Sequence, residues 1–136
     1  MKRRTYLKSV LTGAGALASA VVARSDAAVP VRKKIQLHVD LAVDPAREDE
    51  MLHNFRTIFR PAASRQAGYI DVEMLKLRSA LQGAAPAGVN YRFVLTYASE
   101  ELRQKWVASD THQKVWPTIE KTLSSKDYTV LLFDIG

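Results

Sequence analysis

Apolar and polar residues alternate from residue 34 onward, as in a strand with one buried face. In "KIQLHVDLAV" every second side chain is apolar, and Gln36, His38 and Asp40 lie between them. The apolar set is Ile35, Leu37, Val39, Leu41 and Val43. Successive side chains of a strand point to opposite faces, so the three polar residues are expected on the face opposite the apolar set.

The pattern then changes to a helical period. Asp44 is placed to cap a helix that has Pro45 at its first position and acidic residues in its first turn. Apolar side chains recur every three or four residues and predict one buried stripe, which leaves His53 facing solvent. The stripe consists of Met51, Leu52, Phe55, Ile58 and Phe59. Pro61 is expected to end or bend this helix.

Three more strands and a second helical region complete the pattern. The strands are expected at 68–78, 91–99 and 128–136, with a loop rich in Gly, Ala and Pro at 79–90. A change of apolar phase in the first of them predicts either a β-bulge or a strand that is apolar on both faces near Met74. Ser99 and the acids after it begin a helical region that runs to about Leu123.

This order of elements predicts an α+β fold of the ferredoxin-like βαββαβ type. Such a fold has a four-stranded antiparallel sheet with two helices on one face. The other face mixes polar residues of the first strand with apolar residues of the second and fourth. We expect the same face of a second molecule to cover it, which gives a homodimer, an α/β barrel with a small cavity inside.

Residues 1–27 have the features of a cleavable export signal. A basic start with Lys2, Arg3 and Arg4 is followed by an uncharged stretch that is too short to span a membrane. The run "RRTYLK" resembles the twin-arginine motif, so we expect export by that pathway to the periplasm or outside the cell. No stable membrane anchor is expected after cleavage. A short linker, 28–33, then leads to one domain, 34–136.

The signal carries much of the positive charge. The chain has 20 basic and 14 acidic residues, and residues 1–27 hold five of the basic and one of the acidic ones, so the remainder carries about +2. This near balance argues against a nucleic-acid partner. The chain has no cysteine, which excludes disulfides, thiolate nucleophiles and thiolate metal sites.

The segment "WVASDTHQKVW", 106–116, contains both tryptophans of the chain and one of its three histidines. On one uninterrupted helix Trp106 and His112 would not share a face, but "SDT" at 109–111 is typical of a helix that breaks and restarts. His112 and Trp116 are four residues apart and would then be neighbours. Two interpretations stay open: a histidine packed between core aromatics, or a base beside a cavity that Trp106 and Trp116 line.

The first strand offers a second candidate base. His38 and Asp40 point the same way, so His38 is interpreted as a proton acceptor with Asp40 orienting it, or both as a polar stripe at a dimer interface. Arg92, on the third strand, is a candidate to hold an anionic substrate or to pair across strands with Asp71 or Glu73. The histidines show no metal-ligand spacing, so no metal is expected.

Residues 34–136 resemble the antibiotic biosynthesis monooxygenase family of dimeric α/β barrels. The resemblance rests on the strand order and on "YRFVLTYASEELRQKWVASDTHQKVW", which has Tyr97, the acidic helix start after Ser99, and then Trp106, Ser109 and His112. Haem-degrading members have an iron-binding histidine ten residues after the tryptophan, where this chain has Trp116. The quinol-oxygenase and signal-processing branches, which have a small residue three positions before a histidine after the helix start, fit better.

The resemblance implies a cofactor-independent monooxygenase that acts on a small aromatic, quinol-type substrate in a dimer cavity. In this hypothesis His38 or His112 removes a proton, and Trp106 and the strand aromatics exclude water. The alternatives are a non-catalytic periplasmic ligand-binding or stress-related protein, and an interaction module whose exposed sheet face makes the dimer. Turnover needs a base beside the pocket, binding needs only the pocket, and the third function needs neither.

Overall fold

The computed structural model describes residues 33–136, and the predicted export signal and most of the predicted linker lie outside this range. The helical elements are η3 (Pro45–Arg47), α2 (Glu48–Asn54), η4 (Phe55–Phe59), α3 (Arg60–Ala63), α4 (Glu100–Ala108) and α5 (Asp110–Glu120). The strands are β2 (Ile35–Leu41), β3 (Tyr69–Lys76), β4 (Tyr91–Tyr97) and β5 (Thr129–Asp134). None of the described helices is long and apolar enough to cross a membrane.

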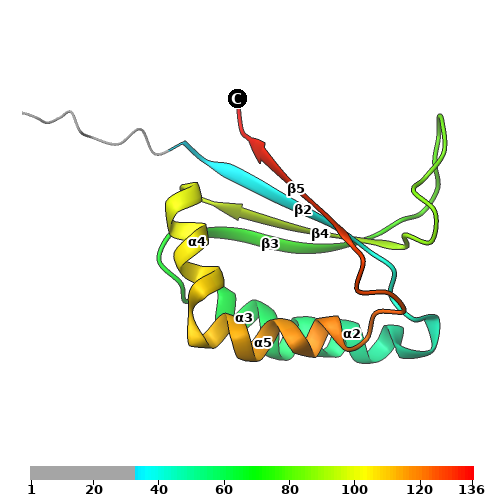
Figure 1. Cartoon of the computed structure of the whole chain (residues 1–136), viewed down its shortest axis with the longest axis horizontal. Coiled ribbons are helices and arrows are strands. Elements are labelled where there is room, and N and C mark those ends of the chain that lie inside the picture. Colours follow the sequence, from blue (N-terminus) through cyan, green and yellow to red (C-terminus); the bar gives the residue numbers. More distant parts are fainter. Residues whose placement is uncertain (1–32) are drawn as a thin grey trace, which may run out of the picture. The chain divides into compact units, whose positions relative to one another are not determined.

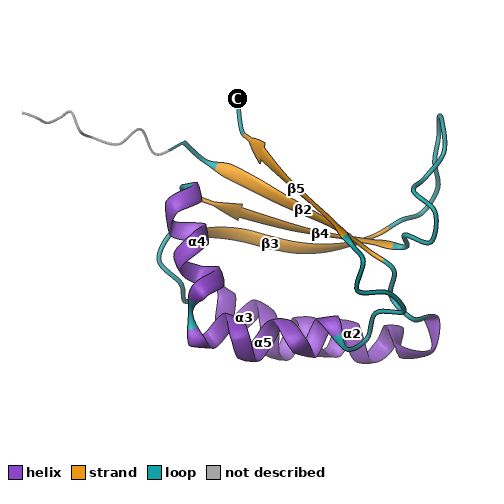
Figure 2. Cartoon of the chain, viewed as in Figure 1, coloured by secondary structure: helices purple, strands orange, loops and turns teal. Residues whose placement is uncertain are grey.

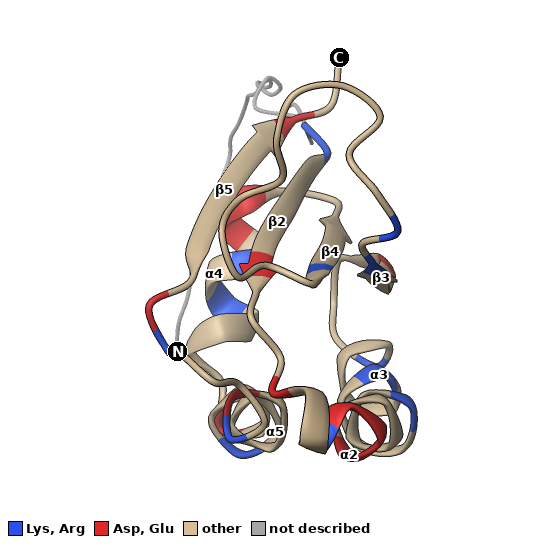
Figure 3. Ribbon diagram, turned by 90° about the vertical axis from the view of Figure 1, so that its right-hand side faces the viewer, with Lys and Arg blue, Asp and Glu red and all other residues tan. Residues whose placement is uncertain are grey.

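The four strands form one antiparallel sheet in the order β3-β4-β2-β5, which confirms the predicted ferredoxin-like fold. Strand β2 lies inside the sheet and pairs with β4 on one side and β5 on the other. The helices lie together on one face of this sheet (Figures 1 and 2), and the side view shows the two layers (Figure 3). The opposite face, without helices, is called the open face below.

The core lies between the sheet and the helices. The apolar set of β2 points into it, together with alternate residues of β4 and the stripe of the first helical segment. The best buried large side chains are Tyr97, Phe55, Phe59, Leu41, Met51, Leu95 and Ile119. Ile58 differs from the expectation, because it is exposed on the outer side of its helix. His53 is exposed, as predicted.

The first helical segment continues through Pro61 instead of ending there. Asp44 caps it as predicted, accepting a hydrogen bond from the backbone N–H of Ala46 at 2.9 Å. The turn before Pro61, η4, has π-helical hydrogen bonding. Proline lacks an N–H and crowds the preceding turn, and a wider π turn relieves both problems without a break. The helix therefore reaches Ala63 and presents Phe59 to the core.

The β-bulge is at Ile70 and not near Met74. Strand β3 pairs Tyr69 with Tyr97 and then Asp71 with Thr96, so Ile70 is the extra residue. From Asp71 onward the strand alternates regularly, with Val72 and Met74 towards the helices. The phase change near Met74 instead reflects a strand that is apolar on both faces, as the alternative expectation had it: Val72 and Met74 face the helices, and Leu75, opposite Arg92 in the register, is exposed on the open face.

Gly68 brings α4 close to the start of β3. Its φ is +91°, a backbone conformation that favours glycine. A Cβ at this position would lie 2.7 Å from Cδ1 of Leu102 on α4, which is closer than van der Waals contact allows. The absence of a side chain at Gly68 thus sets the distance between α4 and the sheet.

Candidate functional site

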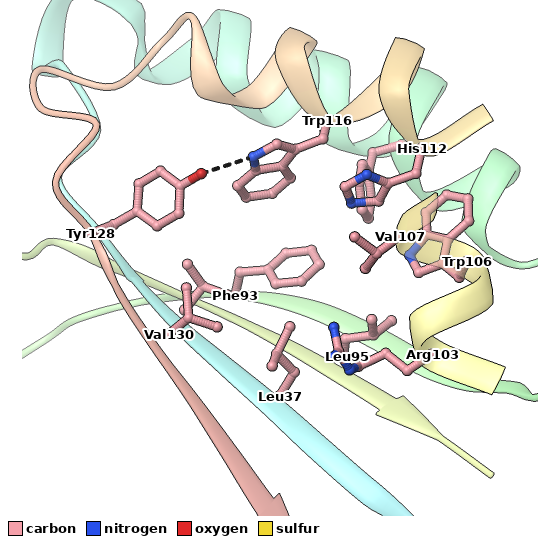
Figure 4. A pocket seen from close by; sticks show the side chains of 12 residues that line it. Leu37, Phe93, Leu95, Arg103, Trp106, Val107, His112, Trp116, Tyr128 and Val130 are labelled. Atoms are coloured by element: carbon pink, nitrogen blue, oxygen red, sulfur yellow. Dashed lines mark hydrogen bonds between the residues drawn. The ribbon is translucent and has the colours of Figure 1, made fainter. Parts of the chain in front are cut away.

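A pocket of about 160 Å³ lies between the sheet and helices α4 and α5, beside strand β5 (Figure 4). Its lining is mainly apolar and aromatic: Leu37, Val39, Phe59, Phe93, Leu95, Arg103, Trp106, Val107, His112, Trp116, Tyr128 and Val130. A cavity of about 150 Å³ is known to hold a benzene molecule. The pocket therefore has room for about one aromatic ring.

His112 lies between the two tryptophans because the helical region breaks at Ser109. The Ser109 hydroxyl caps α5 by accepting a hydrogen bond from the backbone N–H of His112 at 3.2 Å, and it donates to the carbonyl oxygen of Trp106 at 2.6 Å. The His112 ring meets Trp106 edge to face, with centroids 5.0 Å apart, and stacks on Trp116 at 6.3 Å. The predicted break and the predicted proximity of His112 to both tryptophans are confirmed.

The surroundings of His112 favour its neutral form. Burial lowers the pKa of His112 below the ordinary 6.5, and the nearby positive charge of Arg103 lowers this pKa further. Its Nδ1 is buried and has no hydrogen-bond partner among the described residues. A protonated imidazole would need a partner for the proton on that nitrogen, so the charged form is disfavoured again. At neutral pH His112 therefore has a free lone pair and can accept a proton.

Phe59 joins the aromatic walls of the pocket. Its ring makes edge contacts with Phe93, Trp106 and Trp116 at centroid distances of 5.3, 5.9 and 5.9 Å. Edge-to-face pairs of this kind contribute about 0.5–1.5 kcal/mol each beyond the burial of their area. Since Phe59 comes from the π turn before Pro61, the irregular helix directly shapes the back of the pocket.

Trp116 is held by a short polar chain. Its indole Nε1 donates to the hydroxyl of Tyr128 at 3.1 Å, and that hydroxyl donates to Oε2 of Glu120 at 2.8 Å. Burial raises the pKa of Tyr128, so the phenol remains a hydrogen-bond donor. Tyr128 was not among the residues predicted for the site, although it begins the last predicted strand. Its role follows from the return of the chain to the sheet next to β2.

Arg103 is the other polar residue of the pocket that the sequence analysis missed. It lies on α4 three residues before Trp106, so both side chains leave the helix on the same side. Its Nε and Nη2 donate to the two carboxylate oxygens of Glu100 at 2.6 and 2.7 Å. The spacing relative to Trp106 was the available signal, but a charged residue in a helical pattern is normally taken as solvent-facing.

His38, Asp40 and Arg92 lie on the open face, away from the pocket. The cross-strand interpretation of Arg92 is confirmed with a different partner: its Nε donates to Oδ1 of Asp40 at 2.7 Å, and Asp40 lies directly opposite it in the register. His38 Nε2 is 2.8 Å from Oε1 of Gln36. Burial lowers the pKa of His38, and Arg92 adds to this effect.

The structure therefore divides the six predicted residues between two faces of the sheet. It brings Trp106, His112 and Trp116 together in one pocket, and Asp40 and Arg92 together as an ion pair on the open face beside His38. Within residues 33–136 no group of three or more His, Asp or Glu side chains is arranged to hold a metal ion.

No protein-family model and no curated protein matches the sequence. Solved structures do match. A provisionally assigned antibiotic biosynthesis monooxygenase from Caulobacter crescentus is 16% identical, with a TM-score of 0.61 over 78% of this chain and 92% of its own. SnoaB, a cofactor-independent oxygenase from Streptomyces nogalater, is 14% identical, with a TM-score of 0.56 over 76% and 94%.

A dimeric ferredoxin-like protein of unknown function from Jannaschia sp. CCS1 is also similar. It is 16% identical, with a TM-score of 0.60 over 76% of this chain and 98% of its own. At these identities the likeness concerns the backbone fold, and one fold hosts many unrelated functions. This chain is thus a ferredoxin-like α+β protein with the fold of the structurally known antibiotic biosynthesis monooxygenases.

Proposed function

We propose that this protein is an exported, cofactor-independent monooxygenase of the antibiotic biosynthesis monooxygenase type, acting on a small phenol or quinol. The observation that carries the proposal is the position of His112, whose ring lies between two tryptophans in an apolar pocket of single-ring size. Two structural neighbours have an oxygenase name, which agrees with this chemistry. The site is placed in this pocket, within one subunit, and not between two sheets.

In the proposed reaction the substrate supplies the electrons. His112 accepts the phenolic proton, and the resulting anion gives one electron to dioxygen. The substrate radical and superoxide combine to form a C–O bond at a ring carbon that bears hydrogen. The hydroperoxide then loses water: one oxygen atom stays as a carbonyl and the other leaves as water, so a phenol becomes a quinone. Each turnover therefore consumes one dioxygen and needs no external reductant.

The pocket suits this chemistry because its lining is mainly apolar. Aromatic and aliphatic side chains form most of its surface, and the polar groups are few and held in place. An apolar site strengthens electrostatic interactions with the substrate, and a ring that fills the pocket displaces water from it, which protects a reactive anion from side reactions. The indoles of Trp106 and Trp116 offer flat surfaces on which a ring can stack.

The test is oxygen uptake by the purified mature protein with a panel of quinols and phenols. We expect uptake in the wild type and a loss of about 100-fold or more in His112→Ala, because general-base catalysis typically contributes that much. His53→Ala is the matched control, since His53 is exposed on α2, and it should retain full uptake.

His38→Ala separates the two candidate bases. His38 lies on the open face, so its removal should leave uptake unchanged if the reaction takes place at His112. Loss of uptake in a folded His38→Ala protein, with His112→Ala active, would move the site to the open face. Absence of uptake across the whole panel, together with tight binding of the same compounds, would instead favour a binding protein without turnover.

We also propose that the protein forms a homodimer through the open face. Leu131 and Phe133 of β5 are almost half exposed there, next to the polar groups of β2. A second copy would cover this mixed surface and also shield the edge of the sheet. The dimeric state named for the Jannaschia protein supports the proposal by analogy.

A further inference from the structure

Arg103 brings a positive charge to the otherwise apolar wall of the pocket. Its side chain is 16% exposed, and Figure 4 shows it reaching from α4 along the sheet side of the pocket, across from His112. The neighbouring lining residues in this view are Leu37 and Leu95 of the sheet. A buried charge in such surroundings is costly unless a partner compensates it.

Glu100 compensates the charge and fixes the orientation of the guanidinium. Its two oxygens accept from Nε and Nη2 of Arg103, and Gln104 donates to Oε2 of the same carboxylate at 2.9 Å. Guanidinium nitrogens carry five N–H donors in a rigid plane. The third nitrogen, Nη1, makes no hydrogen bond within residues 33–136. It remains available to a ligand in the pocket.

An ordinary phenol is too weak an acid for His112 to deprotonate. A phenol has a pKa of about 10, whereas that of His112 lies below 6.5, so the transfer is unfavourable by more than about three pKa units. A positive charge near the oxygen can recover about one to three of these units. The remaining difference has to come from the substrate itself, which must be an intrinsically acidic phenol.

We propose that Arg103 selects the substrate: it binds the oxyanion of a phenol whose ring carries an electron-withdrawing carbonyl or nitro group, while His112 accepts the proton. In this step the O–H bond breaks and an N–H bond forms on the imidazole. The electron pair stays on the phenol oxygen, where Arg103 donates hydrogen bonds to it. This inference deepens the proposed function and rests on the same pocket as that function.

Pocket size and polarity restrict the ligand further. A volume of about 160 Å³ admits one ring with small substituents. Two tryptophans and Phe93 line the space around the ring, so a planar aromatic is favoured over a sugar or an amino acid. Arg103 is the one cationic group in the lining, so a ligand with a single negatively charged oxygen matches the charge of the pocket.

Binding of 4-nitrophenol tests the inference without any oxygen chemistry. Absorbance of the nitrophenolate shows whether the bound probe is ionised, and fluorescence of the two tryptophans, both in the pocket, shows that the probe is bound. The neutral comparison ligand is 4-nitroanisole, which has the same ring and no acidic proton. The proteins compared are the wild type, Arg103→Gln, Arg103→Lys and the control Lys105→Gln, which removes an exposed charge from the same helix.

We expect the wild type to bind nitrophenol as the phenolate and to lower its apparent pKa. In Arg103→Gln the affinity for nitrophenolate should fall about tenfold or more, because a charge-assisted hydrogen bond is lost, and the affinity for nitroanisole should not change. Lys105→Gln should match the wild type with both ligands. Arg103→Lys keeps the positive charge but lacks the planar set of guanidinium N–H donors, so its affinity for nitrophenolate should fall by an intermediate amount. If Arg103→Gln does not fold, this variant tests whether Arg103 binds the phenolate oxygen.

Three results would overturn the inference. They are failure of the wild type to bind nitrophenolate, an unchanged affinity in a folded Arg103 variant, and an equal loss for both ligands. The outcome is separate from that of the proposed function. Arg103-dependent binding without oxygen uptake would support this inference and contradict the proposed oxygenase function. Oxygen uptake that persists in Arg103→Gln would support the oxygenase function and contradict this inference.

Discussion

At the scale of single residues, the protonation state of His112 determines what the pocket can do. A protonated imidazole has no lone pair for a substrate proton, and it would repel the guanidinium of Arg103. Burial and Arg103 act in the same direction on the pKa of His112, and no described acid opposes them. His112 is therefore neutral over the neutral pH range and can act as the proposed base, although a weaker one than a free histidine.

This arrangement predicts how the protein responds to pH. The proton on His112 should titrate below 6.5, so activity should be constant at neutral pH and fall as the pH drops through the lowered pKa. The unfolded chain binds this proton more readily, so the free energy of unfolding should also decline below about pH 6.5. The C–H resonance of the His112 ring, followed by NMR against pH, measures the titration directly.

The control for this titration is Arg103→Gln. Removing the positive charge should raise the pKa of His112, while the effect of burial remains. A titration of His112 above 6.5 in the wild type, or an unchanged midpoint in the variant, would contradict the electrostatic account of the pocket.

Part of the site could be predicted from the sequence because the residues are close along the chain. Helical spacing relates Trp116 to His112, and the serine at 109 indicates the break that lets Trp106 join them. Arg103 and Tyr128 could not be found in this way. A charged helix residue becomes part of a pocket only through the tilt of α4 against the sheet, and Tyr128 reaches Trp116 only through the pairing of β5 with β2.

At the scale of elements, β5 differs from the other strands because both of its faces remain accessible. Every residue of this edge strand is exposed, although four in a row are apolar. Val130 points to the pocket, and Leu131, opposite His38 in the register, points to the open face. An apolar edge strand without cover is prone to association.

The proposed dimer predicts that Leu131→Asp yields a monomer. The new carboxylate would have to be buried in the proposed interface without a partner, which costs several kcal/mol. Leu132→Asp is the matched control: it is the next residue on the strand, is equally exposed, and points to the helix side. Light scattering coupled to size-exclusion chromatography gives both masses.

We expect a dimer for the wild type and Leu132→Asp and a monomer for Leu131→Asp. A monomeric wild type would contradict the proposed dimer. If the Leu131→Asp variant is still a dimer, the interface lies elsewhere than on the open face.

At the scale of the whole molecule, the order of elements and the sheet were predictable because alternation and helical period are local properties. The side on which the pocket lies was not. Alternation assigns His38 and Asp40 to one face of β2 and Leu37 and Val39 to the other, but it does not tell which face borders a cavity. The layer of helices decides this, through contacts between residues far apart in the chain.

Export is the remaining prediction at this scale. Replacing both residues of the pair, Arg3→Lys and Arg4→Lys, should keep the protein in the cytoplasm, because the twin-arginine pathway requires the arginine pair. The substitutions leave the charge of the signal unchanged. Cell fractionation followed by immunoblotting measures the distribution. The control is Lys2→Arg, which changes a neighbouring basic residue and should be exported normally. Export of the double variant at the wild-type level would rule out this pathway.

Odd-numbered and even-numbered residues of strand β2 lie on opposite faces of the sheet, one towards the helices and the other on the open face. Leu37 and Val39 line the pocket, whereas Gln36, His38 and Asp40 lie on the open face. For protein engineering, the strand thus offers two independent sets of positions. Exchanging Leu37 or Val39 for a smaller residue would enlarge the room for a ligand and leave the proposed association surface intact. Exchanging the even-numbered residues would alter that proposed surface without changing the lining of the pocket.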